Sequence, residues 1–279
     1  MKKIPEIGLG TWLIDNDKVG EVIKTAIELG YRHIDTAQAY GNESGIGQAL
    51  KELNINRDDL YITTKVMAEF KDYESARISI EDSLKRLGLD YVDLILIHSP
   101  EPWVEFRNTN KTYFKENLEV WRALEDAYKA GKVKAIGVSN FRIRDIQNIL
   151  DHAEIPPMVN QVLCHIGQTP FELIDYCQKH NIVIEAYSPI AHGEAGRIQE
   201  IVELANKYRV SVAQICLKYC LQLGLVVLPK ASSREHLKNN LDLDFTISDS
   251  DMELLKGVKP LKDYGSHDFF PVFSKSGKE

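Results

Sequence analysis

The chain has 279 residues, of which 44% are hydrophobic and 27% charged, with a net charge of -7. These values are ordinary for a globular protein with a large apolar core. The acidic balance excludes a typical nucleic-acid or anionic-membrane partner, and no apolar run is long enough to span a bilayer. Because the first residues, MKKIPEIGLG, lack the hydrophobic core of a signal peptide, we expect a cytoplasmic protein.

Short apolar runs alternate with segments of helical periodicity along the whole chain. The predicted strands are, in chain order, residues 7–12, 31–36, 60–65, 92–98, 133–139, 157–162, 182–188 and 224–230. Runs such as the LILI of residues 94–97 are apolar at every position, which is typical of parallel strands covered on both faces. Eight strands, each followed by a helix, predict an α/β protein with a single (β/α)8 TIM barrel over residues 1–279. A doubly wound open sheet is the alternative.

Helix boundaries can be predicted at several points between these strands. An apolar stripe at helical spacing precedes Gly30, a residue suited to end a helix. Thr169 with Glu172, and again Ser211 with Gln214, have the spacing of a capping box at a helix start.

The four cysteines are expected to be structural. Cys164, Cys177, Cys216 and Cys220 form no C-x-x-C pair, and no nearby histidine completes a zinc site. Since free cysteine is among the most buried residue types, we expect four buried thiols, with neither a disulfide nor a metal site.

Polar side chains follow the predicted strands at the points where the strands end. They are Asp35, Lys65, His98, Ser139, Asn140, Gln161, Tyr187, Ser188 and Lys230. In a barrel these carboxyl-terminal ends gather on one rim, which is where barrel enzymes have their active sites. Lys65 follows a buried stretch and would need a counter-charge, which Asp35 can supply.

Tyr40 gives this rim an acid–base group. A tyrosine has a pKa near 10, and a nearby ammonium such as that of Lys65 favours the phenolate and lowers the pKa toward neutrality. Tyr40 is therefore a candidate proton donor to a developing alkoxide, with His98 as a second hydrogen-bonding group. Acid catalysis on a carbonyl oxygen fits this set, and the hydride would come from a cofactor.

The sequence resembles the aldo-keto reductase family over nearly its whole length. The motifs that carry the resemblance are, in order, GLGTW, GYRHIDTAQAYGNE, ITTKV, LILIHSP, GKVKAIGVSNF, VNQV, EAYSPI and LPKASSREHLKNN. One such motif would be weak evidence, whereas eight in the same order are specific.

The resemblance implies roles for individual residues. Tyr40 would be the general acid, tuned by Lys65 and Asp35, and His98 would orient the substrate carbonyl. The implied cofactor contacts are Ser139, Asn140 and Gln161 at the nicotinamide carboxamide, Tyr187 stacked on the ring, Ser188 and Pro189 at the pyrophosphate, and Lys230, Ser232, His236 and Asn240 toward the adenosine.

Two departures from the family pattern bear on specificity. His236 stands where relatives that prefer NADPH commonly have arginine, and neutral histidine binds a 2′-phosphate less strongly. We therefore expect NADPH with NADH also accepted, and consider Arg234 as a substitute for the arginine. Many relatives have tryptophan after the catalytic histidine, where this chain has Ser99, so an aromatic wall of the substrate site is lost.

Aromatic residues near the rim are candidates for substrate contacts. Trp12 follows the first strand, and Trp103 lies in the long segment after the fourth; each can line the pocket or pack into the core. The tail that contains Phe269, Phe270 and Phe273 is expected to form a partial lid.

The sequence thus predicts a monomeric reductase of small-molecule carbonyls, chiefly small aldehydes and α-dicarbonyls. One alternative is a barrel that binds nicotinamide nucleotide as a regulatory or redox-sensing subunit. Another is a hydrolase or isomerase, which would require a metal cluster or paired carboxylates at the strand ends.

Overall fold

Eight short parallel strands form the centre of the molecule. The computed structural model describes residues 2–53 and 55–274. The strands are β1 (Leu9–Gly10), β2 (His33–Asp35), β3 (Tyr61–Val66), β4 (Leu94–Ile97), β5 (Ile136–Ser139), β6 (Val159–Leu163), β7 (Val183–Tyr187) and β8 (Val226–Leu228). Each pairs in parallel with the next in sequence order, and the bridges Ile7–Val227 and Gly10–Lys230 join the first strand to the eighth. The predicted barrel is confirmed, and the open sheet is wrong.

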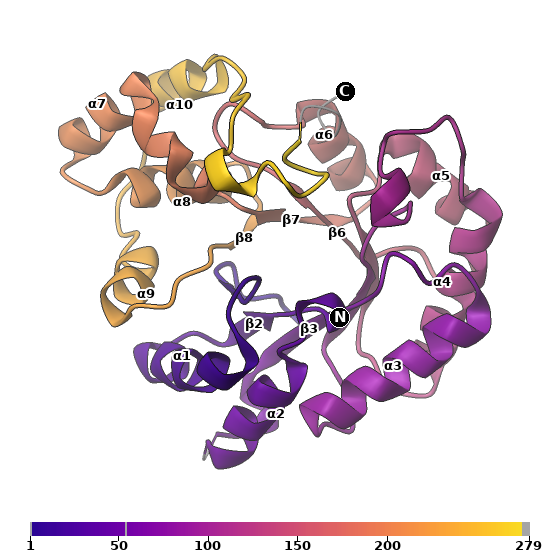
Figure 1. Cartoon of the computed structure of the whole chain (residues 1–279). Helices are drawn as coiled ribbons and strands as arrows, with labels where there is room; N and C mark the ends of the chain where they lie inside the picture. The colour runs from indigo at the N-terminus through magenta and orange to yellow at the C-terminus, as the bar shows by residue number, and fades with distance from the viewer. Residues whose placement is uncertain (1, 54, 275–279) are drawn as a thin grey trace.

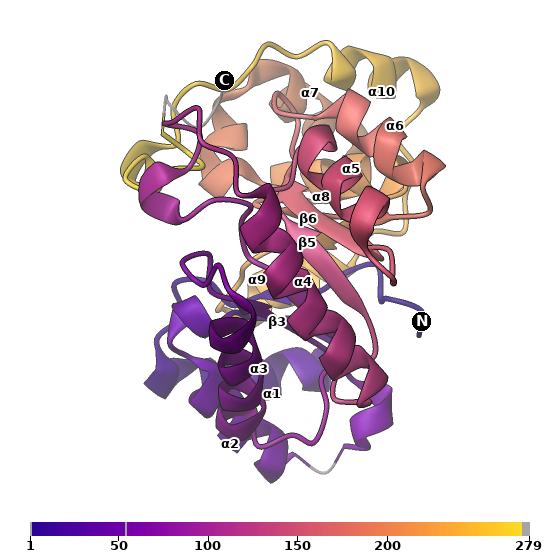
Figure 2. The same cartoon turned by 90° about the vertical axis from the view of Figure 1, so that its right-hand side faces the viewer.

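Helices surround the strands on the outside (Figures 1 and 2). They are α1 (Asn16–Leu29), α2 (Glu43–Glu52), α3 (Tyr73–Leu87), α4 (Phe114–Lys129), α5 (Ile143–His152), α6 (Phe171–Lys179), α7 (Gln199–Tyr208), α8 (Val212–Gln222), α9 (Arg234–Leu241) and α10 (Asp249–Lys256). Short 3-10 turns are η1 (Gln38–Tyr40), η2 (Arg57–Asp59), η3 (Trp103–Glu105), η4 (Ala191–Arg197) and η5 (Gly265–His267). Within the described residues, no helix has both the length and the apolar character needed to cross a bilayer.

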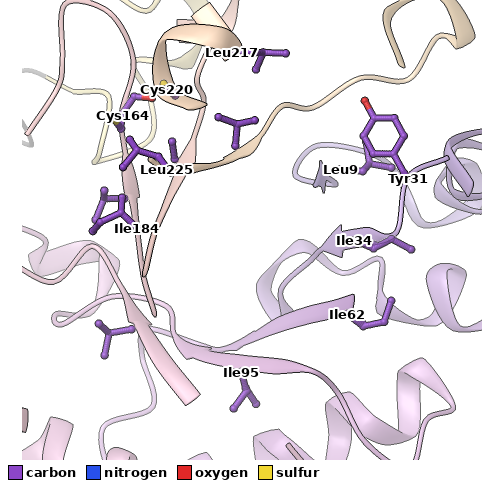
Figure 3. Close-up of a cluster of buried hydrophobic side chains, with 14 of the residues drawn as sticks. Leu9, Tyr31, Ile34, Ile62, Ile95, Cys164, Ile184, Leu217, Cys220 and Leu225 are labelled. Carbon is purple, nitrogen blue, oxygen red and sulfur yellow. Dashed lines mark hydrogen bonds between the residues drawn. The ribbon is translucent and has the colours of Figure 1, made fainter. Parts of the chain in front are cut away.

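Alternation along each strand divides the core into two layers. Ile34, Ile62 and Ile95 extend from β2, β3 and β4 toward the helices and are fully buried there (Figure 3). Residues one position away, such as Tyr61 and Leu94, face the barrel interior and belong to a separate, smaller apolar cluster. The alternation of side chains along a strand therefore decides which of them face the barrel interior. The inward-facing residues at the end of each strand lie at the carboxyl-terminal rim.

The helix boundaries agree with the sequence except at one position. Gly30 ends α1 with a φ of 110°, and Ser211 begins α8 with the predicted capping box. Thr169 does not cap α6, because its hydroxyl donates instead to the carbonyl oxygen of His165 at 2.9 Å. The turn before α6 thus uses the hydroxyl that the capping box would have required.

All four cysteines are buried and free, as predicted. Burial raises the pKa of Cys216 to about 12 and that of Cys177 to about 11, so both remain thiols at neutral pH. Their role is to fill the space between the strands and the helices.

Candidate active site

A cavity of about 570 Å³ opens at the carboxyl-terminal ends of the strands. Most of the predicted site residues line it: Trp12, Asp35, Tyr40, His98, Trp103, Ser139, Asn140, Gln161, Tyr187, Ser188, Pro189, Lys230, His236 and Asn240. Lys65 is fully buried behind this lining. Ser232 is exposed and does not line the cavity, so the structure gives no support for its predicted cofactor contact.

Lys65 is the centre of a buried polar cluster at the floor of the cavity. Its Nζ donates to Oδ1 of Asp35 at 2.7 Å, to the carbonyl oxygen of Thr36 at 2.9 Å and to Oη of Tyr40 at 3.3 Å. Asp35 and Lys65 both face the barrel interior from the adjacent strands β2 and β3, and η1 returns the chain so that Tyr40 reaches the same point. The predicted counter-charge and the predicted proximity of the phenol are both present.

The direction of the Tyr40 pKa differs from the prediction. Burial raises the pKa of Tyr40 above its usual 10, and the positive charge of Lys65 offsets this only in part. Burial alone would lower the pKa of Lys65, but the attraction of Asp35 and Tyr40 outweighs it, so the pKa of Lys65 is raised. The sequence revealed the nearby charge but not the depth of burial. The result is a protonated phenol next to a permanent ammonium.

His98 is held as a neutral imidazole at the wall of the cavity. Burial, together with the charges of Lys65 and Lys71, lowers its pKa well below 6.5. Its ring lies 5.6 Å from that of Tyr40 and 5.2 Å from that of Trp103. Trp103 thus supplies an aromatic wall beside His98, although Ser99 itself is small and fully buried.

Three polar side chains, those of Ser139, Asn140 and Gln161, and the ring of Tyr187 line the cavity along the next strands. Oγ of Ser139 donates to the carbonyl oxygen of Gln161 at 2.9 Å, and Nδ2 of Asn140 donates to the carbonyl oxygen of His98 at 3.1 Å. Asn140 has a φ of 63°, a left-handed conformation that asparagine tolerates better than most residues. The hydroxyl of Tyr187 donates to Oδ1 of Asn140 at 2.6 Å, which holds the Tyr187 ring at the cavity.

Glu185 is a buried acid that the sequence analysis did not single out. Nε2 of Gln161 lies 2.8 Å from Oδ2 of Asp35 and 2.8 Å from Oε2 of Glu185. Burial, with repulsion from Asp35, raises the pKa of Glu185 to about 8. Residues 182–188 were assigned a strand and the cofactor contacts of Tyr187 and Ser188, but no role was given to Glu185. The signal that could have found it was an acid at an inward-facing position within an apolar run.

The far end of the cavity contains the residues expected to lie near an adenosine. Lys230, His236 and Asn240 all line it, and the Ser233 hydroxyl accepts from the backbone N–H of His236 at 3.2 Å, which caps α9. Arg234, considered as a substitute for the missing arginine, does not line the cavity. Its guanidinium is paired with the Glu28 carboxylate through contacts of 2.9 and 3.0 Å.

Aromatic side chains surround the entrance to the cavity. The ring of Phe270 lies 5.4 Å from that of Trp12 and 4.8 Å from that of Trp103. Phe273 also lines the cavity, whereas Phe269 is 70% exposed. The tail therefore covers part of the entrance, and both tryptophans face the cavity.

Two histidines at this entrance were not predicted as site residues. His192 in η4 and His267 in η5 both line the cavity, and their rings stack with centroids 3.9 Å apart. Burial lowers the pKa of His192 to about 3. No motif indicated this pair, because its members lie in two segments whose contact depends on the fold.

The chain is similar to known proteins in both sequence and structure. A family model described as the aldo/keto reductase family matches residues 6–260. The chain is 42% identical to glyoxal reductase of Bacillus subtilis, over 92% of this chain and 89% of that protein. It is 37% identical to methylglyoxal reductase DkgA of Escherichia coli, over 89% and 87% respectively. A solved aldo-keto reductase complexed with NADPH matches with a TM-score of 0.83 and 32% identity, over 98% of this chain and 88% of the other.

Proposed function

The chain belongs to the aldo/keto reductase family of oxidoreductases, and we propose that it reduces small aldehydes and α-dicarbonyls to alcohols with NADPH. The observation that supports this most is the contact of the Lys65 ammonium with both Tyr40 and Asp35 beside an open cavity. The relatives named glyoxal reductase and methylglyoxal reductase support the substrate class.

The residues of the cavity suit a nicotinamide nucleotide. Gln161 lines the cavity, and its Oε1 has no hydrogen-bond partner among the described residues, so it can accept from a carboxamide. The broad face of Tyr187 suits a planar ring, and Lys230 and His236 supply basic groups at the far end for phosphates. When bound there, NADPH would supply the hydride to the carbonyl carbon.

The protein's own groups manage the proton and the charge. Tyr40 keeps its proton at neutral pH because burial raises its pKa, and it donates that proton to the carbonyl oxygen as negative charge develops. The ammonium of Lys65 then stabilises the phenolate that remains. Neutral His98 can hydrogen-bond to the same oxygen without introducing a competing charge.

The experiment measures NADPH consumption with methylglyoxal and with an aromatic aldehyde, in parallel with NADH. The variants are Tyr40→Phe and, as a matched control, Tyr176→Phe, whose hydroxyl donates to Gln147 on the surface. We expect turnover by the wild type and the control, and loss of at least roughly a hundredfold in kcat for Tyr40→Phe with cofactor binding retained.

A wild-type protein that binds NADPH tightly but reduces no carbonyl in a broad panel would contradict the reductase proposal. That result would instead favour a nucleotide-binding regulatory or redox-sensing barrel. Since such a protein needs no proton donor, Tyr40→Phe would then leave its function intact.

A further inference from the structure

Glu185 is a buried acid that the proposed proton transfer does not use. It lies in the middle of β7 with no exposed surface, and its register partner on β6 is Gln161. Taking a carboxyl group out of water is costly, and an apolar side chain of similar volume would fill the same space without that cost. Its Oε1 has no hydrogen-bond partner among the described residues and lies 4.0 Å from Nε2 of His33. The one hydrogen bond found for the Glu185 side chain is its 2.8 Å contact with Gln161.

Two acceptors on one amide nitrogen determine the orientation of that amide. The Gln161 amide group carries two N–H donors in one plane, and the carboxyl groups of Asp35 and Glu185 each accept one. With Asp35 alone, the amide could still rotate about that single hydrogen bond. The reversed orientation would turn Oε1 toward the Asp35 carboxylate, which can only accept a hydrogen bond, and this is unfavourable. The pair therefore fixes the amide plane and directs Oε1 away from the two acids.

We propose that Glu185 is a positioning residue that holds the Gln161 amide so that its carbonyl oxygen accepts a hydrogen bond from the carboxamide of the nicotinamide. The inference rests on the nicotinamide cofactor proposed above. It adds a reason why the site would prefer a ligand that carries a carboxamide NH2. A ligand with an NH2 at this point gains a hydrogen bond. A ligand with a methyl group there gains none and leaves Oε1 without a partner.

The test compares equilibrium binding of NADP⁺ with that of its 3-acetylpyridine analogue, in which a methyl group replaces the carboxamide NH2. Calorimetry on the full chain needs no turnover. The variants are Glu185→Met, which removes the side-chain oxygen that accepts from Gln161, and Glu185→Gln, which keeps an oxygen acceptor at this position. Glu125→Met is the matched control, because Glu125 is a buried acid on α4 that accepts from the backbone N–H of Ile155 and does not line the cavity.

For the wild type we expect NADP⁺ to bind roughly fivefold more tightly than the analogue, the value of one neutral hydrogen bond. This ratio should approach one in Glu185→Met and stay near the wild-type value in Glu185→Gln and Glu125→Met. An unchanged ratio in a folded Glu185→Met protein would overturn the inference. If the wild type bound neither nucleotide, the proposed function itself would fail, which is a different result.

A second measurement needs no variant at position 185. In the ligand-free wild type, both side-chain N–H groups of Gln161 should exchange with solvent much more slowly than those of an exposed glutamine such as Gln199. The signals are assigned by their loss in Gln161→Glu. Exchange as fast as at Gln199 would show that the two acids do not hold the amide.

Discussion

The ammonium of Lys65 lies 3.3 Å from the phenolic oxygen of Tyr40, at a point where neither group is fully exposed to water. A charge exposed to water affects its neighbours only weakly, but a buried charge affects them strongly. The proton affinity of Tyr40 therefore depends on its burial, which raises the pKa, and on the charge of Lys65, which partly offsets that rise.

Removing this ammonium separates its catalytic effect from its structural one. Lys65→Met should lower kcat by about a hundredfold or more, because the phenolate left after proton donation loses its counter-charge. It should also destabilise the fold by about 3–5 kcal/mol, since Asp35 is left as a buried carboxylate without its counter-charge. In the double variant Lys65→Met, Asp35→Asn most of the stability should return while kcat stays low. Steady-state kinetics measures kcat, and urea unfolding measures the free energy of unfolding. Recovery of kcat in the double variant would contradict the catalytic role of Lys65.

Cofactor preference should respond to the residue at position 236. In His236→Arg the permanent charge and fixed donors of arginine should improve NADPH binding relative to NADH by about tenfold. Dissociation constants from tryptophan fluorescence provide the measurement. His152→Arg, the same change on the exposed surface of α5, controls for net charge. Equal shifts in both variants would mean that His236 does not lie near the 2′-phosphate.

Substrate size should depend on Phe270. Its ring contacts both Trp12 and Trp103 at the cavity entrance, so Phe270→Ala should widen the entrance and raise kcat/KM for bulky aromatic aldehydes relative to methylglyoxal by roughly tenfold. The neighbouring Phe269→Ala removes a mostly exposed ring and should leave this ratio unchanged. A ratio that moves equally in the two variants would argue against a specific lining role for Phe270.

The buried acid Glu185 should make stability depend on pH. Its pKa is about 8 in the folded protein against an ordinary value of 4.5, so the folded state holds this proton more tightly than the unfolded chain does. The contribution is fully present below about pH 4.5 and is lost as pH rises through about 8, for a total on the order of 5 kcal/mol.

Glu185→Gln removes this titration. Between pH 5 and pH 9, roughly the range over which the contribution is lost, the free energy of unfolding of the wild type should fall relative to that of the variant. Urea unfolding at several pH values measures the difference, and other titrating groups cancel in it. Parallel curves for the two proteins would show that Glu185 does not carry the proton in the folded state.

Much of the fold and part of the site were predictable from residue patterns. The continuous apolar runs and their regular alternation with helices indicate a parallel sheet covered on both faces, and the count of eight strand–helix units favours a barrel over an open sheet. Asp35, Lys65 and His98 follow three such runs, so barrel topology alone brings them to one rim. The order of these residues along the chain was sufficient for this, since neighbouring strands in sequence are neighbours in the sheet.

Other features were decided only by the tertiary structure, because they depend on burial and on distances between remote segments. The pKa of Tyr40 is raised because desolvation outweighs the charge of Lys65, and no sequence pattern gives the balance of two opposing effects. Arg234 is paired with Glu28, 206 positions away, a contact that no local sequence pattern indicates. The Gln161 amide between two acids likewise requires side chains from three strands to meet at a single nitrogen. The sequence alone thus determined which groups reach the rim, whereas the packing of the barrel decided their charges, partners and orientations.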